Sequence, residues 1–206
     1  MERKGFLVTI ASPSGGGKSS VCHELLKRHH DLCYSVSWTT RPKRGMEIDS
    51  QDYFFTDLLT FQNKVSTGFF LEYALVHGNY YGTPESFVTN QIRQGKIVLF
   101  DIDVQGVEII KKRGEYDIVT IFLLPPNERI LQERLINRGT DTTENIAIRI
   151  ANAHSEIIKY VMYDYLVIND QFETTMRILS SILDSEKHRV KRYIDPVTTF
   201  YPKEKK

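Results

Sequence analysis

A glycine-rich segment that ends in lysine and serine, Ser14-Gly15-Gly16-Gly17-Lys18-Ser19, carries the most specific chemistry in the chain. It follows the apolar run Phe6–Ala11 and precedes a helical pattern over Lys18–His29. Glycines let main-chain N–H groups approach phosphates, and a helix N-terminus favours negative charge. The lysine can reach the β- and γ-phosphates, and the serine hydroxyl can ligate Mg²⁺. The spacing therefore predicts a P-loop that holds a nucleoside triphosphate.

The segment departs from the general pattern G-x-x-x-x-G-K-[ST] at one position, where Ser12 replaces the first glycine. Serine is small, and the loop can bend there if φ stays negative. The alternative interpretation is a glycine-rich turn followed by a chance Lys-Ser. The flanking strand and helix favour the phosphate-binding loop, because they are the context that such a loop requires.

Two arginines three residues apart, Arg41 and Arg44, lie on a loop that also contains Pro42 and Gly45. Arginine presents planar, bidentate donors that suit phosphate oxygens, so the two side chains could converge on one phosphate. A solvated basic loop explains this pattern equally well when the segment is taken alone.

One carboxylate, Glu72, lies within the apolar run Phe69-Phe70-Leu71-Glu72-Tyr73-Ala74. A buried carboxylate needs a partner or is neutralised. Guanine offers its N1–H and N2–H donors side by side, which a carboxylate can accept together, whereas adenine lacks this pair. Taken alone, the segment favours an outward-pointing glutamate, because glutamate is mostly exposed in proteins.

Tyrosines, carboxylates and further arginines could complete a phosphoryl-transfer site. Tyr81 precedes Thr83, which is predicted to cap the next helix. An apolar strand that ends in Asp101 and Asp103 indicates a Walker B carboxylate near the P-loop Mg²⁺. Three arginines on a polar turn could bring positive charge to a migrating phosphoryl group, although surface arginines are the plain alternative. These three are Arg134, Arg138 and Arg149.

Short apolar runs alternate with helical patterns, which predicts an α/β fold with three α/β/α layers around a mostly parallel five-stranded sheet. The predicted core strands are Phe6–Ala11, Tyr34–Ser37, Ile97–Ile102, Ile118–Leu123 and Tyr165–Ile168. The predicted helices are Lys18–His29, Pro84–Gln94, Asn127–Asn137, Thr143–Tyr163 and Phe172–Ile194. Residues 38–82 are expected to form an inserted lobe and residues 137–150 a mobile lid. The core domain then comprises residues 1–37, 83–136 and 151–206.

Charge and composition limit the classes of partner that the chain is expected to bind. Lys plus Arg total 27 against 26 Asp plus Glu, a net charge of +1, so no global positive field favours nucleic acid or a membrane surface. No run approaches the ~20 apolar residues of a membrane span, and the N-terminus lacks a signal-peptide pattern. Two cysteines do not make a disulfide framework, so a cytoplasmic location is expected.

Taken together, these segments resemble guanylate kinase, the P-loop family that phosphorylates GMP with ATP. The similarity runs from Phe6 to Asp170, and the matching strings agree in both order and spacing. They are Ser12 through Ser19, Ser37 through Arg44, Asp52-Tyr53, Glu72, Gly78 through Thr83, Asp101-Ile102-Asp103, Arg138-Gly139-Thr140, Arg149 and Ile168-Asn169-Asp170.

The resemblance implies a set of site residues. Those for ATP are Ser12, Pro13, Ser14, Gly15, Gly16, Gly17, Lys18, Ser19, Ser20, Arg134 and Asn169, the last at the border of the adenine pocket. Those for GMP are Ser37, Arg41, Arg44, Tyr53, Glu72, Tyr81, Gly82, Thr83, Asp101 and Asp103. The catalytic cations would be Lys18, Arg41, Arg44, Arg138 and Arg149. Mg²⁺ would accompany ATP and lie near Ser19 and Asp103.

The chain departs from the family pattern between residues 42 and 50. Pro42 comes one place early, Met46-Glu47 stands where the family has Gly-Glu, with Gly45 shifted by one, and Ser50 replaces a glycine. These differences leave the path of that loop open. Two other functions also stay open, a non-catalytic interaction module of the same fold and a kinase for another nucleoside monophosphate. The sequence does not fix the oligomeric state.

Overall fold

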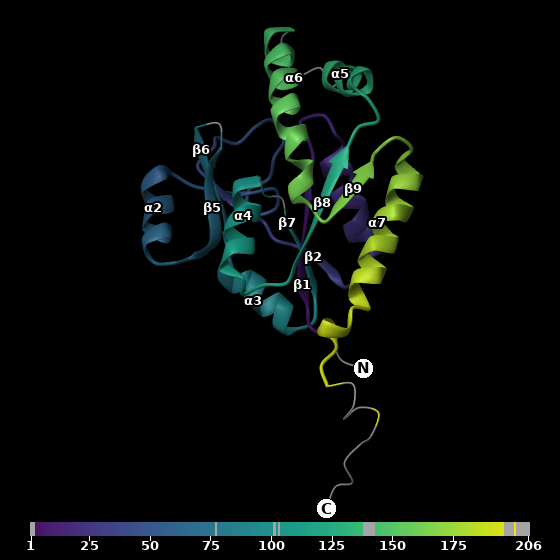
Figure 1. Ribbon diagram of the computed structural model, residues 1–206. Helices are drawn as coiled ribbons and strands as arrows, with labels where there is room; N and C mark the ends of the chain where they lie inside the picture. The colour runs from purple at the N-terminus through teal and green to yellow at the C-terminus, as the bar shows by residue number, and fades with distance from the viewer. Residues whose placement is uncertain are drawn as a thin grey trace, which may run out of the picture.

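A computed structural model describes residues 3–76, 78–100, 102, 104–137, 143–195 and 200 of the chain, with only the backbone at 104, 137 and 143–149. Its main element is a five-stranded sheet in the order β2-β7-β1-β8-β9 (Figure 1). Every neighbouring pair in this sheet is parallel. The strands are β1 (Phe6–Ala11), β2 (Leu32–Tyr34), β7 (Ile97–Phe100), β8 (Ile118–Leu124) and β9 (Tyr165–Ile168).

The central strand β1 is buried at all six positions, which is what a strand covered on both faces requires. On one face, Phe6, Val8 and Ile10 join a core with α1 (Lys18–Arg28) and α7 (Phe172–Lys187). On the other face, Leu7 joins a core with α3 (Glu85–Arg93) and α4 (Val104–Arg113). The alternating faces of one strand therefore hold three layers together, which confirms the predicted α/β/α fold.

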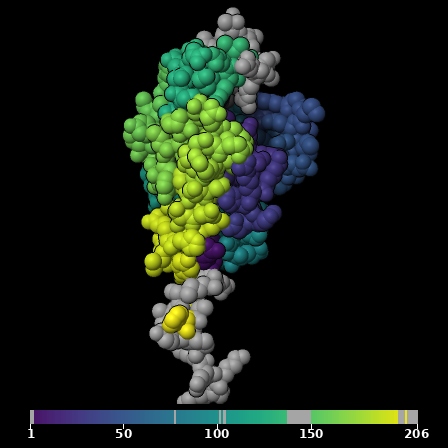
Figure 2. Space-filling view, turned by 90° about the vertical axis from the view of Figure 1, so that its right-hand side faces the viewer, coloured from purple at the N-terminus to yellow at the C-terminus, as the bar shows by residue number. Residues whose placement is uncertain are grey.

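A second, four-stranded sheet has the order β4-β3-β6-β5 and lies to one side of the first (Figure 1). Its elements are β3 (Trp38–Thr39), β4 (Phe54–Phe55), α2 (Leu58–Ser66), β5 (Phe70–Val76) and β6 (Asn79–Pro84). Aromatic rings hold it together, with Phe61 of α2 stacked on Phe70 at 4.6 Å between centroids and Trp38 on Phe54 at 5.1 Å. In the space-filling view this lobe, in blue, projects from the side of the molecule away from α7, in yellow (Figure 2).

One prediction about local structure was wrong, and one helix was missed. The N-cap residue of helix α3 is Pro84, and Thr83 belongs to strand β6, because Thr83 pairs with Glu72 across the β5–β6 ladder. Helix α4 was not predicted, since Gly106 interrupts its apolar pattern. The remaining differences are shifts of boundaries, among them β2, which ends at Tyr34 rather than Ser37.

The other helices lie near their predicted positions. Helix α5 spans Glu128–Asn137, and α6 spans Thr143–Ile157 before a 3-10 turn, η1, at Ile158–Met162. A second 3-10 turn, η2, spans Val190–Arg192. Both cysteines are free thiols. None of the described helices combines the length and apolar character that crossing a lipid bilayer requires.

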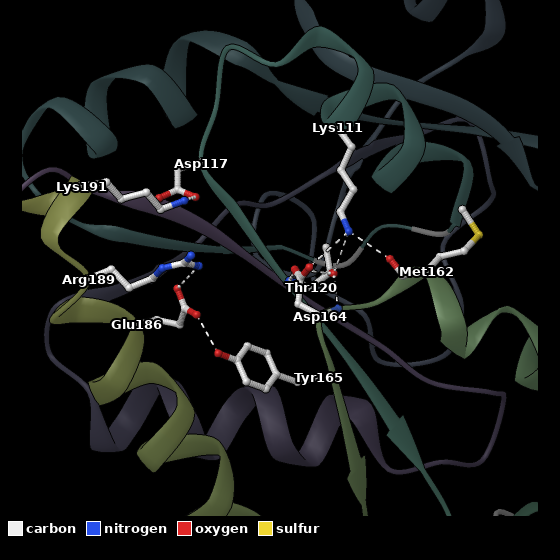
Figure 3. A network of polar contacts seen from close by, with 9 residues as sticks. All are labelled: Lys111, Asp117, Thr120, Met162, Asp164, Tyr165, Glu186, Arg189 and Lys191. Carbon is white, nitrogen blue, oxygen red and sulfur yellow. Dashed lines mark hydrogen bonds and ion pairs between the residues drawn. The ribbon is translucent and has the colours of Figure 1, made fainter.

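A buried charge cluster ties the C-terminal segment to the amino end of the sheet. Arg192 is 1% exposed, its guanidinium lies 3.5 Å above the ring of Phe6, and its Nη2 donates to Glu186 Oε2 at 2.8 Å. The same nitrogen lies 3.1 Å from Asp117 Oδ2. Figure 3 shows Glu186 also accepting a hydrogen bond from the Tyr165 hydroxyl, at 2.7 Å. Burial lowers the pKa of Arg192, so its charge depends on these carboxylates.

Replacing Glu186 by glutamine should lower the free energy of unfolding by about 3 kcal/mol, because it leaves part of a buried charge uncompensated. Urea unfolding measures the loss. The matched control is Asp184→Asn on the same helix, whose exposed pair with Lys187 at 3.1 Å should contribute less than about 1 kcal/mol. If both variants lost the same free energy of unfolding, burial would not be the reason why the Glu186 ion pair stabilises the fold.

Candidate functional site

The loop between β1 and α1 has the geometry of a phosphate-binding cradle. Gly15 and Gly17 have φ values of 88° and 93°, a left-handed backbone that favours glycine. Gly16 donates its N–H to Pro13 O at 2.8 Å and packs against the Ser12 side chain, which leaves no room for a Cβ at Gly16. The N-cap of α1 is Gly17, which has no side chain to cap the helix, and an uncapped helix N-terminus favours an anion.

A cavity of about 520 Å³ opens over this loop, and its wall contains every residue predicted to bind ATP. Arg134 comes from α5 and Asn169 directly follows β9, whereas the other predicted residues belong to the loop and to the first turn of α1. The complete lining is Ser12, Pro13, Ser14, Gly15, Gly16, Gly17, Lys18, Ser19, Ser20, Arg134, Asn169, Asp170 and Phe172.

A second cavity, of about 450 Å³, lies between the lobe and the core. Four of the residues predicted for GMP line it, namely Ser37, Tyr53, Glu72 and Tyr81. Ser12 and Lys18 line both cavities. The lysine of the loop therefore stands at the junction of a phosphate cradle and a polar pocket.

The structure places Glu72 inside the protein, so the outward-pointing alternative is wrong. Glu72 is 4% exposed and lies on the wall of the second cavity. Thr83, which is fully buried, donates its hydroxyl to Glu72 Oε1 at 2.5 Å. The ladder between β5 and β6 pairs these two residues directly. Each oxygen of a carboxylate can accept more than one hydrogen bond, so Glu72 on the cavity wall can accept hydrogen bonds from a ligand as well as from Thr83.

Helix α4 approaches this carboxylate through its backbone at Gly106. A Cβ atom built at Gly106 would lie 2.8 Å from Glu72 Oε2 and 3.1 Å from the Cβ of Ile102. At the other end of α4, Arg113 Nη1 donates to the Leu71 carbonyl at 2.8 Å. Helix α4 thus fixes the strand on which Glu72 lies, and sequence reasoning did not identify either contact.

The two predicted phosphate-binding arginines differ in their environment. Arg41 is 6% exposed and makes a bidentate ion pair with Glu47, at 2.9 and 2.7 Å. This hydrogen-bonded pair raises the pKa of Arg41 and lowers the pKa of Glu47. The guanidinium also lies 5.2 Å from the centre of the Tyr53 ring. Arg44 is exposed, and its backbone N–H donates to Glu47 at 2.7 Å. The solvated-loop alternative therefore describes Arg44 but not Arg41.

The structure accommodates one of the departures from the family pattern, at Ser50. Ser50, which replaces a family glycine, has a left-handed φ of 63°. Its strain is offset locally, because its hydroxyl donates to Asp49 at 3.0 Å and its N–H donates to Tyr53 O at 2.8 Å.

Several predicted residues cannot be placed. Asp101, Asp103 and Arg138 lie outside the described residues, and of Arg149 only the backbone, within α6, is described. Gly82 lies in β6 opposite Trp38.

Sequence reasoning missed a polar face on α6 and η1 that walls the second cavity. Its residues recur at spacings of three, four and seven, which is the repeat of one helix face and could have been recognised. They are Asn152, Ser155, Glu156 and Lys159.

Comparison with known proteins agrees with this geometry. The family model described as Guanylate kinase matches residues 4–186. The chain is 46% identical to the guanylate kinase of Rickettsia typhi over 90% of this chain and 94% of that one, and 44% identical to that of Carboxydothermus hydrogenoformans over 92% of each. A crystal structure of guanylate kinase from Anaplasma phagocytophilum superposes with a TM-score of 0.81 at 30% identity, covering 98% of this chain and 96% of that one. The chain therefore belongs to the guanylate kinase family.

Proposed function

We propose that the protein transfers the γ-phosphoryl group of ATP to the phosphate of GMP, or of dGMP, giving ADP and GDP or dGDP. The observation that carries this proposal is the position of Lys18 between a cradle of main-chain amides and a pocket that contains a buried carboxylate. A donor polyphosphate in the first cavity and an acceptor nucleotide in the second would meet at this ammonium group.

The first cavity would hold ATP, with the first-turn N–H groups of α1 and Lys18 on its phosphates. Mg²⁺ fits this site, because the exposed Ser19 hydroxyl on the cavity wall is a hard oxygen ligand, and Asp103 would supply a carboxylate. No cluster of three or more His, Cys, Asp or Glu side chains exists among the described residues, which suits an ion bound largely by phosphate and water. When bound, Mg²⁺ would neutralise charge on the phosphates.

The second cavity would hold GMP. Glu72 would accept the N1–H and N2–H groups of guanine, while Thr83 keeps the carboxylate in place. The phosphate would lie near Tyr53 and Tyr81, where Arg41 would exchange part of its ion pair with Glu47 for phosphate oxygens.

The reaction needs no general base, because the attacking oxygen of GMP is already anionic. The protein would supply alignment, positive charge and exclusion of water. We assign the charge on the transferring group to Lys18 and to the lid arginines Arg138 and Arg149. Closure of the lobe (residues 38–82) and the lid (137–150) over the core would deliver this charge after both substrates bind.

A coupled assay of ADP release with GMP, dGMP, AMP, CMP and UMP tests this function against a kinase for another monophosphate and against a non-catalytic module. We expect turnover with the guanine nucleotides and its loss by orders of magnitude in Lys18→Ala, with the melting temperature retained. Equal rates with AMP, or a Lys18→Ala variant with most of its activity, would rule the proposal out.

Glu72→Gln places an amide donor opposite the guanine N–H groups. We expect kcat/KM for GMP to fall by the equivalent of about 1–3 kcal/mol, since a polar group is left unmatched. Steady-state kinetics with varied GMP measure the effect. The control is Glu24→Gln on α1, whose exposed pair with Arg28 at 2.8 Å lies outside both cavities. A Glu72→Gln variant as active as this control would remove Glu72 from the base pocket.

Gly106→Ala adds one methyl group against the Glu72 carboxylate. Alanine favours helix by about 1 kcal/mol over glycine, so α4 itself should not be weakened. We expect KM for GMP to rise about tenfold, or about 1.4 kcal/mol, while KM for ATP stays constant as the internal control. An unchanged KM for GMP would show that α4 can shift to accommodate the methyl group without moving the Glu72 carboxylate.

A further inference from the structure

Asn169 is the residue at which three elements around the phosphate loop meet. It follows β9, is 5% exposed, and uses all of its polar groups. Its amide Nδ2 donates to Gly16 O at 2.7 Å, and its Oδ1 accepts from the Thr175 hydroxyl of α7 at 3.0 Å. Its backbone N–H donates to Leu124 O at 2.7 Å, and its backbone oxygen accepts from Arg134 Nη2 at 2.9 Å.

The orientation of this amide is fixed by its neighbours. The Gly16 carbonyl can only accept, so the NH₂ group must face the loop and the oxygen must face Thr175. The contact is close, because a Cβ at Gly17 would lie 2.5 Å from Asn169 Nδ2. The amide therefore fills the space behind the loop, and its oxygen accepts a hydrogen bond on the side of α7.

A bond to the Gly16 carbonyl also determines where a neighbouring donor points. The carbonyl of Gly16 and the N–H of Gly17 belong to one planar trans peptide and point in opposite directions. Holding the carbonyl toward Asn169 therefore turns the Gly17 N–H away from it, toward the opposite side of the loop.

From these contacts we infer that Asn169 is a positioning residue that holds the phosphate loop in its binding conformation, and that its side chain does not read the adenine base. This inference rests on the proposed ATP site. It differs from the expectation that Asn169 serves the adenine pocket, because the amide is held between the Gly16 carbonyl and the Thr175 hydroxyl, and only 5% of the residue is exposed.

The test compares a donor nucleotide with a ligand that has no base. Asn169→Leu keeps the approximate volume and removes both side-chain hydrogen bonds. Thr175→Val removes only the hydroxyl that holds the amide, and Thr175→Ser restores it as the matched control. For each variant, KM for ATP and for GMP, the inhibition constant of inorganic tripolyphosphate against ATP, the ratio of ATP to GTP as donor, and the melting temperature are measured with Mg²⁺.

We expect Asn169→Leu to raise KM for ATP and the inhibition constant of tripolyphosphate by the same factor, about tenfold, as for loss of a buried hydrogen bond. KM for GMP and the ATP-to-GTP ratio should not change. Thr175→Val should raise both ATP-site constants together by about threefold, and Thr175→Ser should match the native protein. If Asn169→Leu does not fold, the two Thr175 variants decide the question by the same comparison.

A rise in KM for ATP with an unchanged tripolyphosphate constant and a smaller ATP preference would overturn the inference and assign Asn169 to the base. Unchanged constants in all folded variants would overturn it too. If tripolyphosphate did not compete with ATP in the native protein, the proposed ATP site itself would be wrong, a result distinct from either of these.

Discussion

Main-chain N–H groups at the start of α1 can face an anion only if the preceding loop adopts a backbone that most residues avoid. Gly15 and Gly17 provide it with left-handed φ values, and Ser12 packs so closely on Gly16 that this position also excludes a side chain. Such a loop has little core of its own, so other elements must hold it. Asn169 does so from β9, with support from Thr175. The parallel sheet is what brings the ends of β1 and β9 to the same edge.

The second half of the site depends on a carboxylate taken out of water. Burial of a charge is unfavourable unless partners compensate it. Glu72 accepts a hydrogen bond from the Thr83 hydroxyl and lies against the backbone of α4 at Gly106. Glu72 also lies on the wall of the second cavity, where a ligand with hydrogen-bond donors would face an acceptor. The buried guanidinium of Arg41 is compensated in the same way, because it makes two hydrogen bonds to the carboxylate of Glu47.

Much of the core could be predicted from the sequence because its signals are local. The limits of β1 and β9 follow from uninterrupted apolar runs, and the P-loop follows from residue types at fixed spacing. The same reasoning identified the part of the first cavity between Ser12 and Ser20, because it is one contiguous segment, and the family resemblance added Arg134 and Asn169. Asp170 and Phe172, which also line this cavity, were not predicted as site residues.

The errors arose where a distant partner decided the local structure. Thr83 has the composition of a helix cap, but pairing with Glu72 across the ladder takes its hydroxyl. Helix α4 was missed because Gly106 weakens its pattern, and that glycine is required by a contact with β5 that no local rule contains. The burial of Arg41 depends on how the loop bends back to Glu47, which spacing alone does not specify.

The two edges of the parallel sheet carry different features, the proposed site at one edge and a buried charge cluster at the other. Nucleotide chemistry is proposed at the carboxyl edge, whereas the cluster of Arg192, Glu186 and Asp117 holds η2 at the amino edge, against Phe6. Thermal tolerance and turnover can therefore be adjusted independently in this scaffold. Rebuilding the fastening with apolar side chains of matching shape would be a route to a hardier catalyst that leaves its substrate range untouched.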